Sequence, residues 1–413
     1  MNTQDITRLH INETAQKQGF QRDTMEKVIR LYYVLKDMGE ISLFRDNLAL
    51  KGGTAINLAY FNLPRLSVDI DMDFTRSGKM SDLLPYRQKI KENLFNLLQS
   101  QGYTIGKQGK ETHTLDQWIF NYQSIAGNND HIKVELNYGI RNHIFPIVNK
   151  EINLDIVSDD GINIPTLHPC ELFATKINAL IERAAVRDLF DVYSLSQSDL
   201  LSTPEERELL RKSIIFYQTV GVEGTAKKEI NISQIADVPP SKIKSQLLPL
   251  LASGHKFFPI DVAKATTIEY LQSVLTITAK EQEYLDSFSN NIYKPDLLFE
   301  DPAIIDRIIH HPMAIWKMQH AERIFNSDQH ISDKTFLDAI KKDDFTQLVK
   351  LNDEGYIPSS EVISAMNGFA PVQTIIAVQK IFDLKNEIDE FNIRLLKDDN
   401  IKLNNNKNKD LKI

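Results

Sequence analysis

Three aspartates alternate along one short segment of the sequence, SVDIDMDF, at Asp69, Asp71 and Asp73. Residues two apart on a strand point to the same face, so the spacing predicts a row of three carboxylates. Like charges this close repel, and burying them without a counter-charge is costly. A divalent cation is the simplest compensation, because hard cations prefer carboxylate oxygens. The alternative is an exposed acidic strand face, although aspartate is disfavoured in strands.

A small-residue turn, Lys51-Gly52-Gly53-Thr54, precedes the acidic segment. The apolar run 48–50 predicts a strand before the turn, and the residues that follow predict a helix with Thr54 near its N-cap. A strand, a glycine turn and a helix N-terminus together present free backbone N–H groups to an anion such as phosphate. A Gly-Gly pair alone is not specific, since most such pairs are only turns. Together with the acids, the turn predicts a site for a metal and a nucleotide.

A second alternating run, residues 131–138, predicts another strand. Glu135 shares its polar face with Lys133 and Asn137. If this strand neighbours the acidic one, Glu135 supplies a third carboxylate beside Asp69 and Asp71. Taken alone, Glu135 is equally well explained as a surface residue.

Residues 169–196 read as one long helix. At about 100° per residue, Lys176, Arg183 and Arg187 fall on one narrow stripe. The stripe predicts a cationic wall that faces the acidic strand, with substrate phosphates between the two. The alternative is an ordinary solvated helix face.

The composition is that of a globular protein with more than one domain. The chain has 413 residues, 42% hydrophobic and 25% charged, with a formal net charge of −8. This charge argues against a surface that is one large nucleic-acid footprint, but it allows a local basic groove. A single cysteine, Cys170, excludes an internal disulfide and fits a reducing compartment. Because neither a signal peptide nor a membrane span is apparent, we expect a cytoplasmic protein.

The remaining pattern is mostly helical. Residues 4–38, 82–101 and much of 200–325 predict helices, and residues 332–383 have the helix–turn–helix rhythm of an ankyrin-like unit. The expected domains are a core with N-terminal helices over 1–200, a helical domain over 201–330, an ankyrin-like extension over 331–396 and a disordered tail over 397–413.

Four motifs carry a family resemblance: KGGTAINL, RLSVDIDMDF, KVELNYGIR and KINALIERAAVRDLFDVY. In this order they resemble the AbiEii/AbiGii family of bacterial nucleotidyltransferase toxins, which belong to type IV toxin–antitoxin and abortive-infection systems. The resemblance covers residues 20–325. It implies an α+β fold, with a polymerase-β-like core of a mixed sheet and flanking helices, followed by a helical C-terminal domain.

The resemblance also implies roles for individual residues. The implied catalytic residues are Asp69, Asp71, Glu135, Lys176 and Asp188. The implied nucleotide-binding residues are Lys51, Gly52, Gly53, Thr54, Arg183 and Arg187. The implied metal ligands are Asp69, Asp71 and Glu135. Asp188 is either a group that orients the lysine and arginine or a direct participant, and Asp191 completes the same helix motif.

The activity implied is transfer of a nucleoside monophosphate from an NTP to an acceptor hydroxyl, with Mg²⁺ (or Mn²⁺) and release of pyrophosphate. The expected acceptor is RNA, at the 3′ end of tRNA, and a cognate antitoxin is the expected partner. Two alternatives stay open. One is a GTP-binding regulatory module without transfer, and the other is a nucleotidyltransferase acting on a protein or a small molecule.

Overall fold

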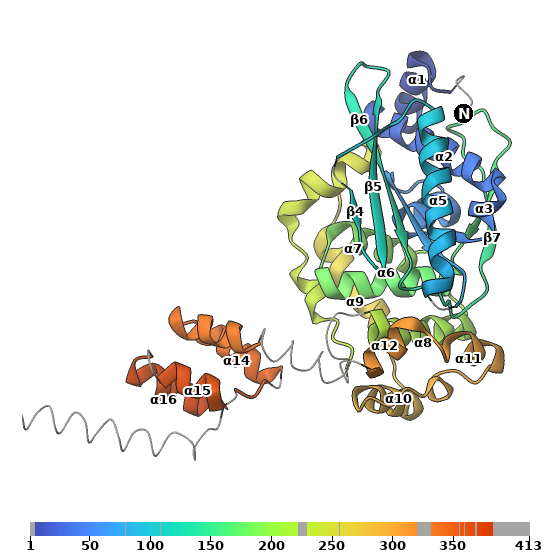
Figure 1. The fold of residues 1–413 in the computed structure, drawn as a ribbon. Coiled ribbons are helices and arrows are strands. Elements are labelled where there is room, and N and C mark those ends of the chain that lie inside the picture. The colour runs from blue at the N-terminus through green and yellow to red at the C-terminus, as the bar shows by residue number, and fades with distance from the viewer. Residues whose placement is uncertain are drawn as a thin grey trace, which may run out of the picture. The chain divides into compact units, whose positions relative to one another are not determined.

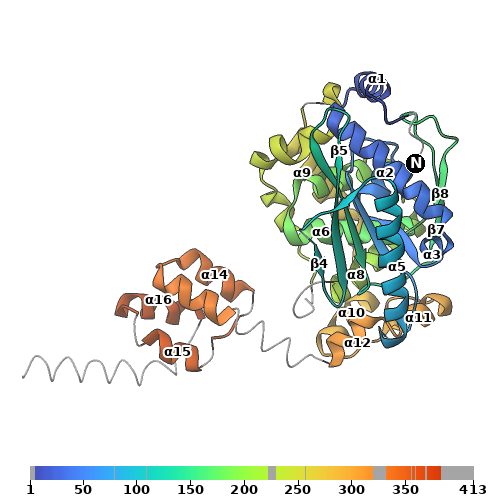
Figure 2. The ribbon, with the colours of Figure 1, turned by 45° about the horizontal axis from the view of Figure 1, so that its top comes forward.

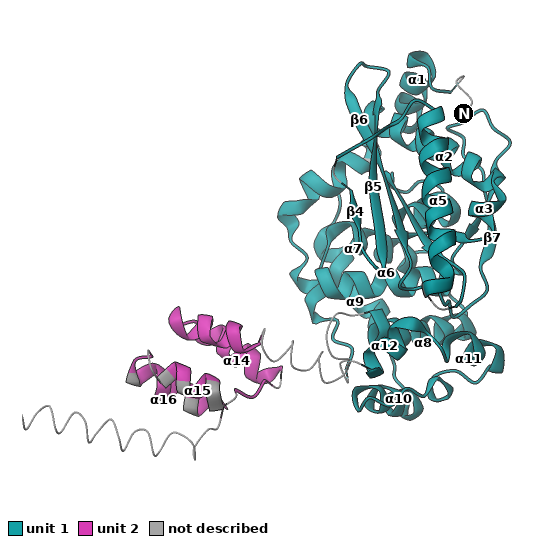
Figure 3. Ribbon diagram, viewed as in Figure 1, with its two compact units in different colours: residues 1–319 teal, residues 320–413 magenta. Residues whose placement is uncertain are grey.

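The computed structural model describes residues 5–319 and 332–382, apart from residues 79, 108, 222–228, 256, 355, 359, 368 and 369. The chain forms two compact units, residues 1–319 and 320–413 (Figure 3). The first unit contains the whole of the sheet and the residues singled out above. The predicted tail over 397–413 lies outside the described residues.

An eight-stranded mixed sheet forms the centre of the first unit (Figure 1). Its order is β3-β5-β6-β2-β1-β8-β7, with β4 paired to β5. β2 is antiparallel to β1 and parallel to β6, so the acidic strand lies between the strand of the glycine turn and the strand of Glu135. The strands are β1 (Leu48–Lys51), β2 (Asp69–Phe74), β3 (Thr104–Ile105), β4 (Lys110–Glu111), β5 (Leu115–Gln123), β6 (Asn129–Asn137), β7 (Val148–Ile152) and β8 (Ile162–Thr166).

Helices surround this sheet in the first unit. The α-helices are α1 (Arg8–Gln18), α2 (Arg22–Glu40), α3 (Ser42–Arg45), α4 (Gly52–Thr54), α5 (Met80–Ser100), α6 (Pro169–Arg183), α7 (Val186–Ser196), α8 (Pro204–Gly221), α9 (Ile260–Val274), α10 (Ala279–Ser289), α11 (Pro302–Ile308) and α12 (Pro312–Gln319). The 3₁₀ and π helices are η1 (Ala55–Tyr60), η2 (Ser233–Asp237), η3 (Pro240–Lys242), η4 (Ile243–Leu247), η5 (Leu248–Leu250), η6 (Ser253–His255) and η7 (Pro295–Leu297).

One face of the sheet is apolar and covered. Ile70, Val134 and Trp118 lie in one cross-strand row and are buried. Phe95 of α5 packs edge-on against Trp118, with ring centroids 5.3 Å apart. Figure 2 shows α2 and α5 crossing the same side of the sheet. Because side chains alternate along a strand, the carboxylates of β2 point to the opposite face.

The predicted α+β class, a mixed sheet with flanking helices followed by further helices, is confirmed. The strands predicted at 48–50 and 131–138 and the helix predicted at 82–101 are present within one or two residues. The acidic strand begins at Asp69, and before it Ser67 and Arg65 make side-chain hydrogen bonds with Thr54 and Asp191. In the described part of the chain, no helix is long and apolar enough to cross a membrane.

The second unit is described by itself. It contains a helix over 332–341 together with α14 (Phe345–Asp353), α15 (Ser360–Asn367) and α16 (Val372–Phe382). Phe336, Leu348, Met366 and Val378 belong to a separate apolar core. The helical rhythm predicted for this region is therefore present, while its ankyrin-like character and the domain limits at 200 and 330 stay predictions.

Candidate active site

The glycine turn lies directly against the acidic strand. β1 ends at Lys51, and Gly52 takes a left-handed conformation with φ of 69°. A Cβ atom on Gly52 would collide with the carboxylate of Asp71. At Gly53, a Cβ would lie 2.8 Å from Nη2 of Arg65. Both glycines are therefore required by close approach, and at Gly52 by backbone conformation as well.

Thr54 does not cap the helix, contrary to the prediction. The helix begins at Gly52, two residues earlier. The Thr54 hydroxyl is buried and hydrogen-bonds inward, to Oγ of Ser67 at 3.0 Å and to the carbonyl of Asp69. Thr54 thus joins the turn to the start of the acidic strand.

The acidic row runs across three strands. Asp71 lies opposite Lys51 on one side and Glu135 on the other, and Asp69 lies beside Lys133. Nζ of Lys133 is 3.4 Å from Oε2 of Glu135. The structure therefore brings Asp69, Asp71 and Glu135 onto one face with two lysines among them.

Electrostatics show that Asp71 carries under-compensated charge. Burial raises its pKa, and Glu135 and Asp69 raise it further, while Lys133 and Lys51 oppose the shift. Burial lowers the pKa of Lys133, but Asp69, Asp71 and Glu135 outweigh it and leave that pKa raised. Negative charge on Asp71 is thus disfavoured in the fold unless a further cation is present.

Asp73 belongs to a different pairing. It is only 2% exposed, and Nζ of Lys51 lies 2.6 Å from its Oδ1. Burial lowers the pKa of Lys51, but Asp73 outweighs it and raises the pKa overall, with Asp71 and Glu135 adding to the rise. Asp73 therefore fixes the lysine of the turn and is removed from the row of candidate ligands.

The prediction of one long helix over 169–196 is wrong. Ala184 is left-handed, with φ of 46°, and it ends α6; α7 then begins at Val186. This break folds Asp188 back onto the end of α6, between Lys176 and Arg183. Nζ of Lys176 is 2.9 Å from Asp188, and both Nε and Nη2 of Arg183 donate to it, at 2.6 and 3.0 Å.

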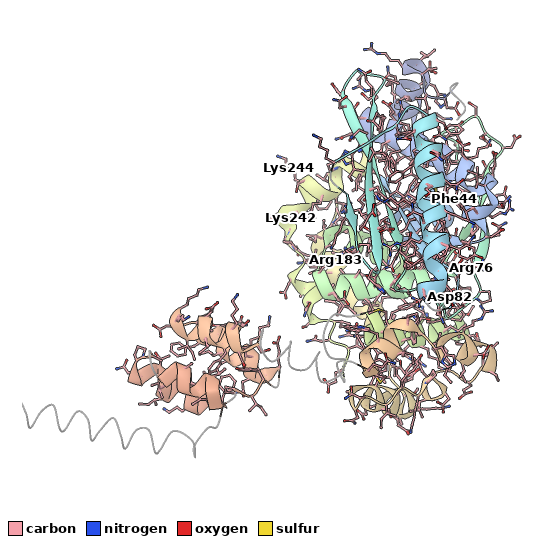
Figure 4. The ribbon with its side chains drawn as sticks, in the orientation of Figure 1. Phe44, Arg76, Asp82, Arg183, Lys242 and Lys244 are labelled. Atoms are coloured by element: carbon pink, nitrogen blue, oxygen red, sulfur yellow. The ribbon has the colours of Figure 1, made fainter. Side chains whose placement is uncertain are left out.

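The predicted cationic stripe is therefore only partly present. Lys176 and Arg183 are brought together by Asp188, whose pKa they hold at about 2 against the opposing effect of burial. The Arg183 side chain remains 63% exposed at the end of α6 (Figure 4). The hydrogen bonds that Arg183 donates to Asp188 raise the pKa of Arg183, burial lowers it, and the charges of Asp188 and Asp71 add to the rise. Arg187 is exposed and, on the new helix, leaves the stripe.

A second acid of α7 ties the helix to the glycine turn. Asp191 is 1% exposed and accepts two hydrogen bonds from Arg65, at 2.7 and 2.6 Å. It also lies 3.3 Å from Lys176 and 3.4 Å from Nδ2 of Asn57. Asn57 in turn donates to the carbonyl of Gly53 at 2.7 Å. These contacts fix the turn relative to α6 and α7.

Sequence reasoning missed three residues of this arrangement. Arg65 and Asn57 are far from α7 in the chain, and no spacing rule links them to Asp191. Lys133 was detectable, because it shares a strand face with Glu135, yet it was not predicted as part of the site.

The donor set fits a hard divalent cation. Within the described ranges, no three His, Cys, Asp or Glu side chains converge closely enough to hold a metal between them. Asp71 and Glu135 nevertheless offer neighbouring carboxylates, which are the ligands that Mg²⁺ prefers. Burial and the neighbouring charges of Glu135 and Asp69 raise the pKa of Asp71, and a bound cation would offset these effects.

Comparison with known proteins assigns the sequence to a protein family. The family model described as "Nucleotidyl transferase AbiEii toxin, Type IV TA system" matches residues 34–275. No curated protein matches the chain. The family assignment therefore rests on the sequence model.

Among solved structures the similarities are distant. The nucleotidyltransferase toxin MenT4 from Mycobacterium tuberculosis H37Rv is 16% identical, with 75% of this chain and 98% of that chain covered and a TM-score of 0.48. A protein of H. pylori assigned as a nucleotidyltransferase is 16% identical, covering 61% and 93%, with a TM-score of 0.36. The cyclic AMP-GMP synthase DncV of Vibrio cholerae is 13% identical, covering 70% and 82%, with a TM-score of 0.17.

Proposed function

The chain belongs to the AbiEii family of nucleotidyltransferase toxins of type IV toxin–antitoxin systems, and from this membership we propose that it transfers a nucleoside monophosphate from an NTP to the 3′ end of tRNA. As a member of this family, it is a nucleotidyltransferase. The observation that carries the proposal is the cross-strand row in which Asp71 lies between Lys51 and Glu135, with Gly52 against its carboxylate.

The acidic row is the proposed metal site. Asp69 and Asp71 would hold Mg²⁺ (or Mn²⁺), which when bound supplies charge neutralisation to the reacting phosphate and the leaving pyrophosphate. Lys133 lies 3.4 Å from Glu135 and balances part of the negative charge in the free enzyme. We assign Lys133 a contact with substrate phosphate once the carboxylates are otherwise compensated.

Glu135 is the proposed acceptor of the proton from the attacking hydroxyl. Its register position beside Asp71 supports this role, because the attacking hydroxyl must lose its proton close to the ion that Asp71 would hold. The alternative role of Glu135, as a ligand to a second ion, uses the same position.

The turn and α6 are the proposed triphosphate site. The backbone N–H groups of Gly52 and Gly53 suit phosphate oxygens, with Lys51 beside them. Arg183 is an exposed cation whose pKa is raised by Asp188 and also by the charge of Asp71, which supports its assignment to the β- and γ-phosphates. Thr54 is turned inward, so we assign it the support of the turn.

Lys176 and Asp188 are proposed to position Arg183. Both are buried and paired with each other, which favours the orienting role for Asp188 over direct participation. Arg187 is exposed at the start of α7, and we assign it to the outer edge of the nucleotide site.

An antitoxin and the two substrates complete the proposal. A type IV toxin family implies an antitoxin, and an NTP and tRNA as substrates place the reaction in the cytoplasm. An acceptor that is a protein or a small molecule is the competing outcome, as is GTP binding without transfer. A module that only binds nucleotide does not require Asp69, Asp71 and Glu135 together.

The test is label transfer. Purified protein is incubated with each α-labelled NTP, Mg²⁺ and total RNA, and with the same mixture lacking RNA. The proposal predicts label in tRNA, loss of label with Asp71→Asn, and full label with the exposed control Glu13→Gln. Label in a protein or a small molecule would reassign the acceptor. Absence of label from every acceptor, with Asp71→Asn as toxic as wild type, would reject the proposal.

A further inference from the structure

A large cavity opens in the first unit at the end of the sheet where β2 and β6 finish. Its volume is about 1520 Å³. The chain after β2 contributes Gly78, the loop after β6 contributes Arg141 and Asn142, and α11 and α12 contribute Arg307, Met313 and Trp316. None of the catalytic or nucleotide-binding residues assigned above lines it, so the cavity has no role in the proposed chemistry so far.

Arg141 gives the cavity its charge. Its guanidinium donates to two backbone carbonyls, those of Tyr138 at 3.2 Å and Gly78 at 3.0 Å, and its Nε is buried without a partner. Among the described residues no carboxylate pairs with it, and burial lowers its pKa. A partly buried cation without a counter-ion is disfavoured, and an anionic ligand such as a phosphate would remove that penalty.

The rest of the lining suits a nucleotide. Met313 and Trp316 provide an apolar wall on α12, and the Trp316 side chain is 44% exposed. Aromatic side chains of this kind stack on nucleic-acid bases irrespective of sequence. Arg307 adds a second cation, which is exposed, against one acid, Asp306, in the lining.

The cavity lies beyond the end of β6, the strand that carries Glu135. Oδ1 of Asn137 accepts hydrogen bonds from the backbone of Gly139 at 2.8 Å and of Ile140 at 3.2 Å, and Gly139 lines the cavity. Asn137 is on the same strand face as Glu135, two residues away, which is about 7 Å along β6. The rim of the cavity therefore begins at Gly139, four residues along the chain from the carboxylate proposed to accept the proton.

The volume of the cavity favours a ligand longer than one small molecule. Pockets for single small ligands usually measure about 300–1,000 Å³, and this cavity exceeds that range. We propose that it holds the terminal nucleotides of the RNA acceptor, with a phosphate on Arg141 and a base against Trp316, so that the terminal hydroxyl reaches the Asp71–Glu135 row. This assignment rests on the proposed function. A free nucleotide acting as an effector has the same chemistry and is the other source to be distinguished.

Quenching of tryptophan fluorescence reports directly on ligand binding in this cavity. The chain has two tryptophans, and the other one, Trp118, is buried in the core under α5. Full-length protein without NTP or divalent cation is titrated with a short single-stranded RNA ending in a free 3′-hydroxyl, and separately with a mononucleotide. We expect quenching by the RNA at a concentration at least tenfold lower than by the mononucleotide. In Trp316→Phe the quenching disappears, while binding of labelled RNA measured by anisotropy persists.

Arg141→Gln is the matched test of the phosphate contact. It should weaken RNA binding by roughly tenfold or more, as expected for loss of a charge-assisted hydrogen bond. Arg8→Gln, a change of the same kind at an exposed position of α1, should leave binding unchanged. If Arg141→Gln fails to fold, Trp316→Ala serves instead, with weaker anisotropy binding than Trp316→Phe expected.

Each outcome decides the assignment. Equal RNA binding by Arg141→Gln and Arg8→Gln, or the absence of Trp316-dependent quenching by RNA, would overturn it. Equal affinity for mononucleotide and RNA would make the cavity an effector site and would also overturn it. If RNA is bound through Arg141 but never receives label, the cavity stands and the proposed function fails. If label transfer is normal and the KM for RNA is unchanged in Arg141→Gln, the proposed function stands and the assignment of the cavity fails.

Discussion

Asp71 of β2 and Glu135 of β6 lie directly opposite each other on neighbouring parallel strands. Two carboxylates at adjacent positions on one face repel each other. Lys133 and Lys51 offset part of this repulsion, but the pKa of Asp71 stays raised. The fold therefore maintains negative charge at a place where it is unfavourable, which is typical of a site that binds a cation.

Neutralising Asp71 should stabilise the free protein while abolishing transfer. A raised pKa means that the charged carboxylate disfavours the folded state at neutral pH, so Asp71→Asn should increase the free energy of unfolding by up to about 1 kcal/mol. Urea unfolding without divalent cations measures this change, with Glu13→Gln on the exposed face of α1 as the control. A clear loss of stability in Asp71→Asn would show that its charge is already compensated.

Gly52→Ala should inactivate the enzyme through Asp71. The new methyl group would displace the Asp71 carboxylate, and such a misplacement costs on the order of 100-fold in rate. The control is Gly102→Ala, because Gly102 is also left-handed, with φ of 85°, but has nothing within 4 Å of its would-be Cβ. Both substitutions place alanine in a left-handed conformation and have a similar backbone cost. Only Gly52→Ala also displaces the Asp71 carboxylate, so only this variant should lose label transfer. Equal activity of the two variants would show that the glycine turn does not position Asp71 for transfer.

Asp188 should make the fold sensitive to acid. Its pKa is about 2 in the folded protein against 3.8 ordinarily, because Lys176 and Arg183 outweigh the effect of burial. Because the pKa of Asp188 is lower in the folded than in the unfolded protein, the charged carboxylate stabilises the fold at pH values above the unfolded pKa. This stabilisation, about 2 kcal/mol, is lost as the pH falls from 4 towards 2.

The measurement is the free energy of unfolding between pH 5 and pH 2. The difference between wild type and Asp188→Asn should shrink as the pH falls, because only wild type has this contribution to lose. Asp46→Asn, at a side chain that is 61% exposed, should follow the wild-type curve. A difference that stays constant with pH would contradict the ion-paired assignment of Asp188.

Truncation after about residue 330 should leave nucleotide binding intact. The first unit ends at residue 319 and contains every residue assigned to the nucleotide, and the second unit has its own apolar core. Calorimetry with a non-hydrolysable NTP compares the truncated and full-length proteins. A folded truncation that no longer binds nucleotide would give the C-terminal unit a part in the site.

The sequence predicted the features that depend on local periodicity. Alternation in β2 and β6 was enough to place Asp71 and Glu135 on polar strand faces, and the register confirms that these faces adjoin. The helix break at Ala184 was not predictable in this way, because alanine favours helices and a left-handed alanine is held there by tertiary contacts.

Contacts between distant segments were also beyond the sequence. Asp191 lies four residues after Arg187, a spacing that allows an ion pair on a helix, yet it binds Arg65 and Lys176 instead. An exposed i, i+4 pair contributes little, whereas burial of Asp191 requires partners that satisfy both of its oxygens. The same burial turned Thr54 away from its predicted capping role.

The most direct test of the central claim is binding of a divalent cation with nucleotide at the acidic row. Electron paramagnetic resonance of Mn²⁺, titrated with a non-hydrolysable NTP, separates free from bound ion without requiring turnover. A metal site at this row predicts nucleotide-dependent Mn²⁺ binding by wild type and Glu13→Gln, and its loss in Asp71→Asn and Glu135→Gln. Undiminished Mn²⁺ binding by a folded Asp71→Asn protein would contradict it.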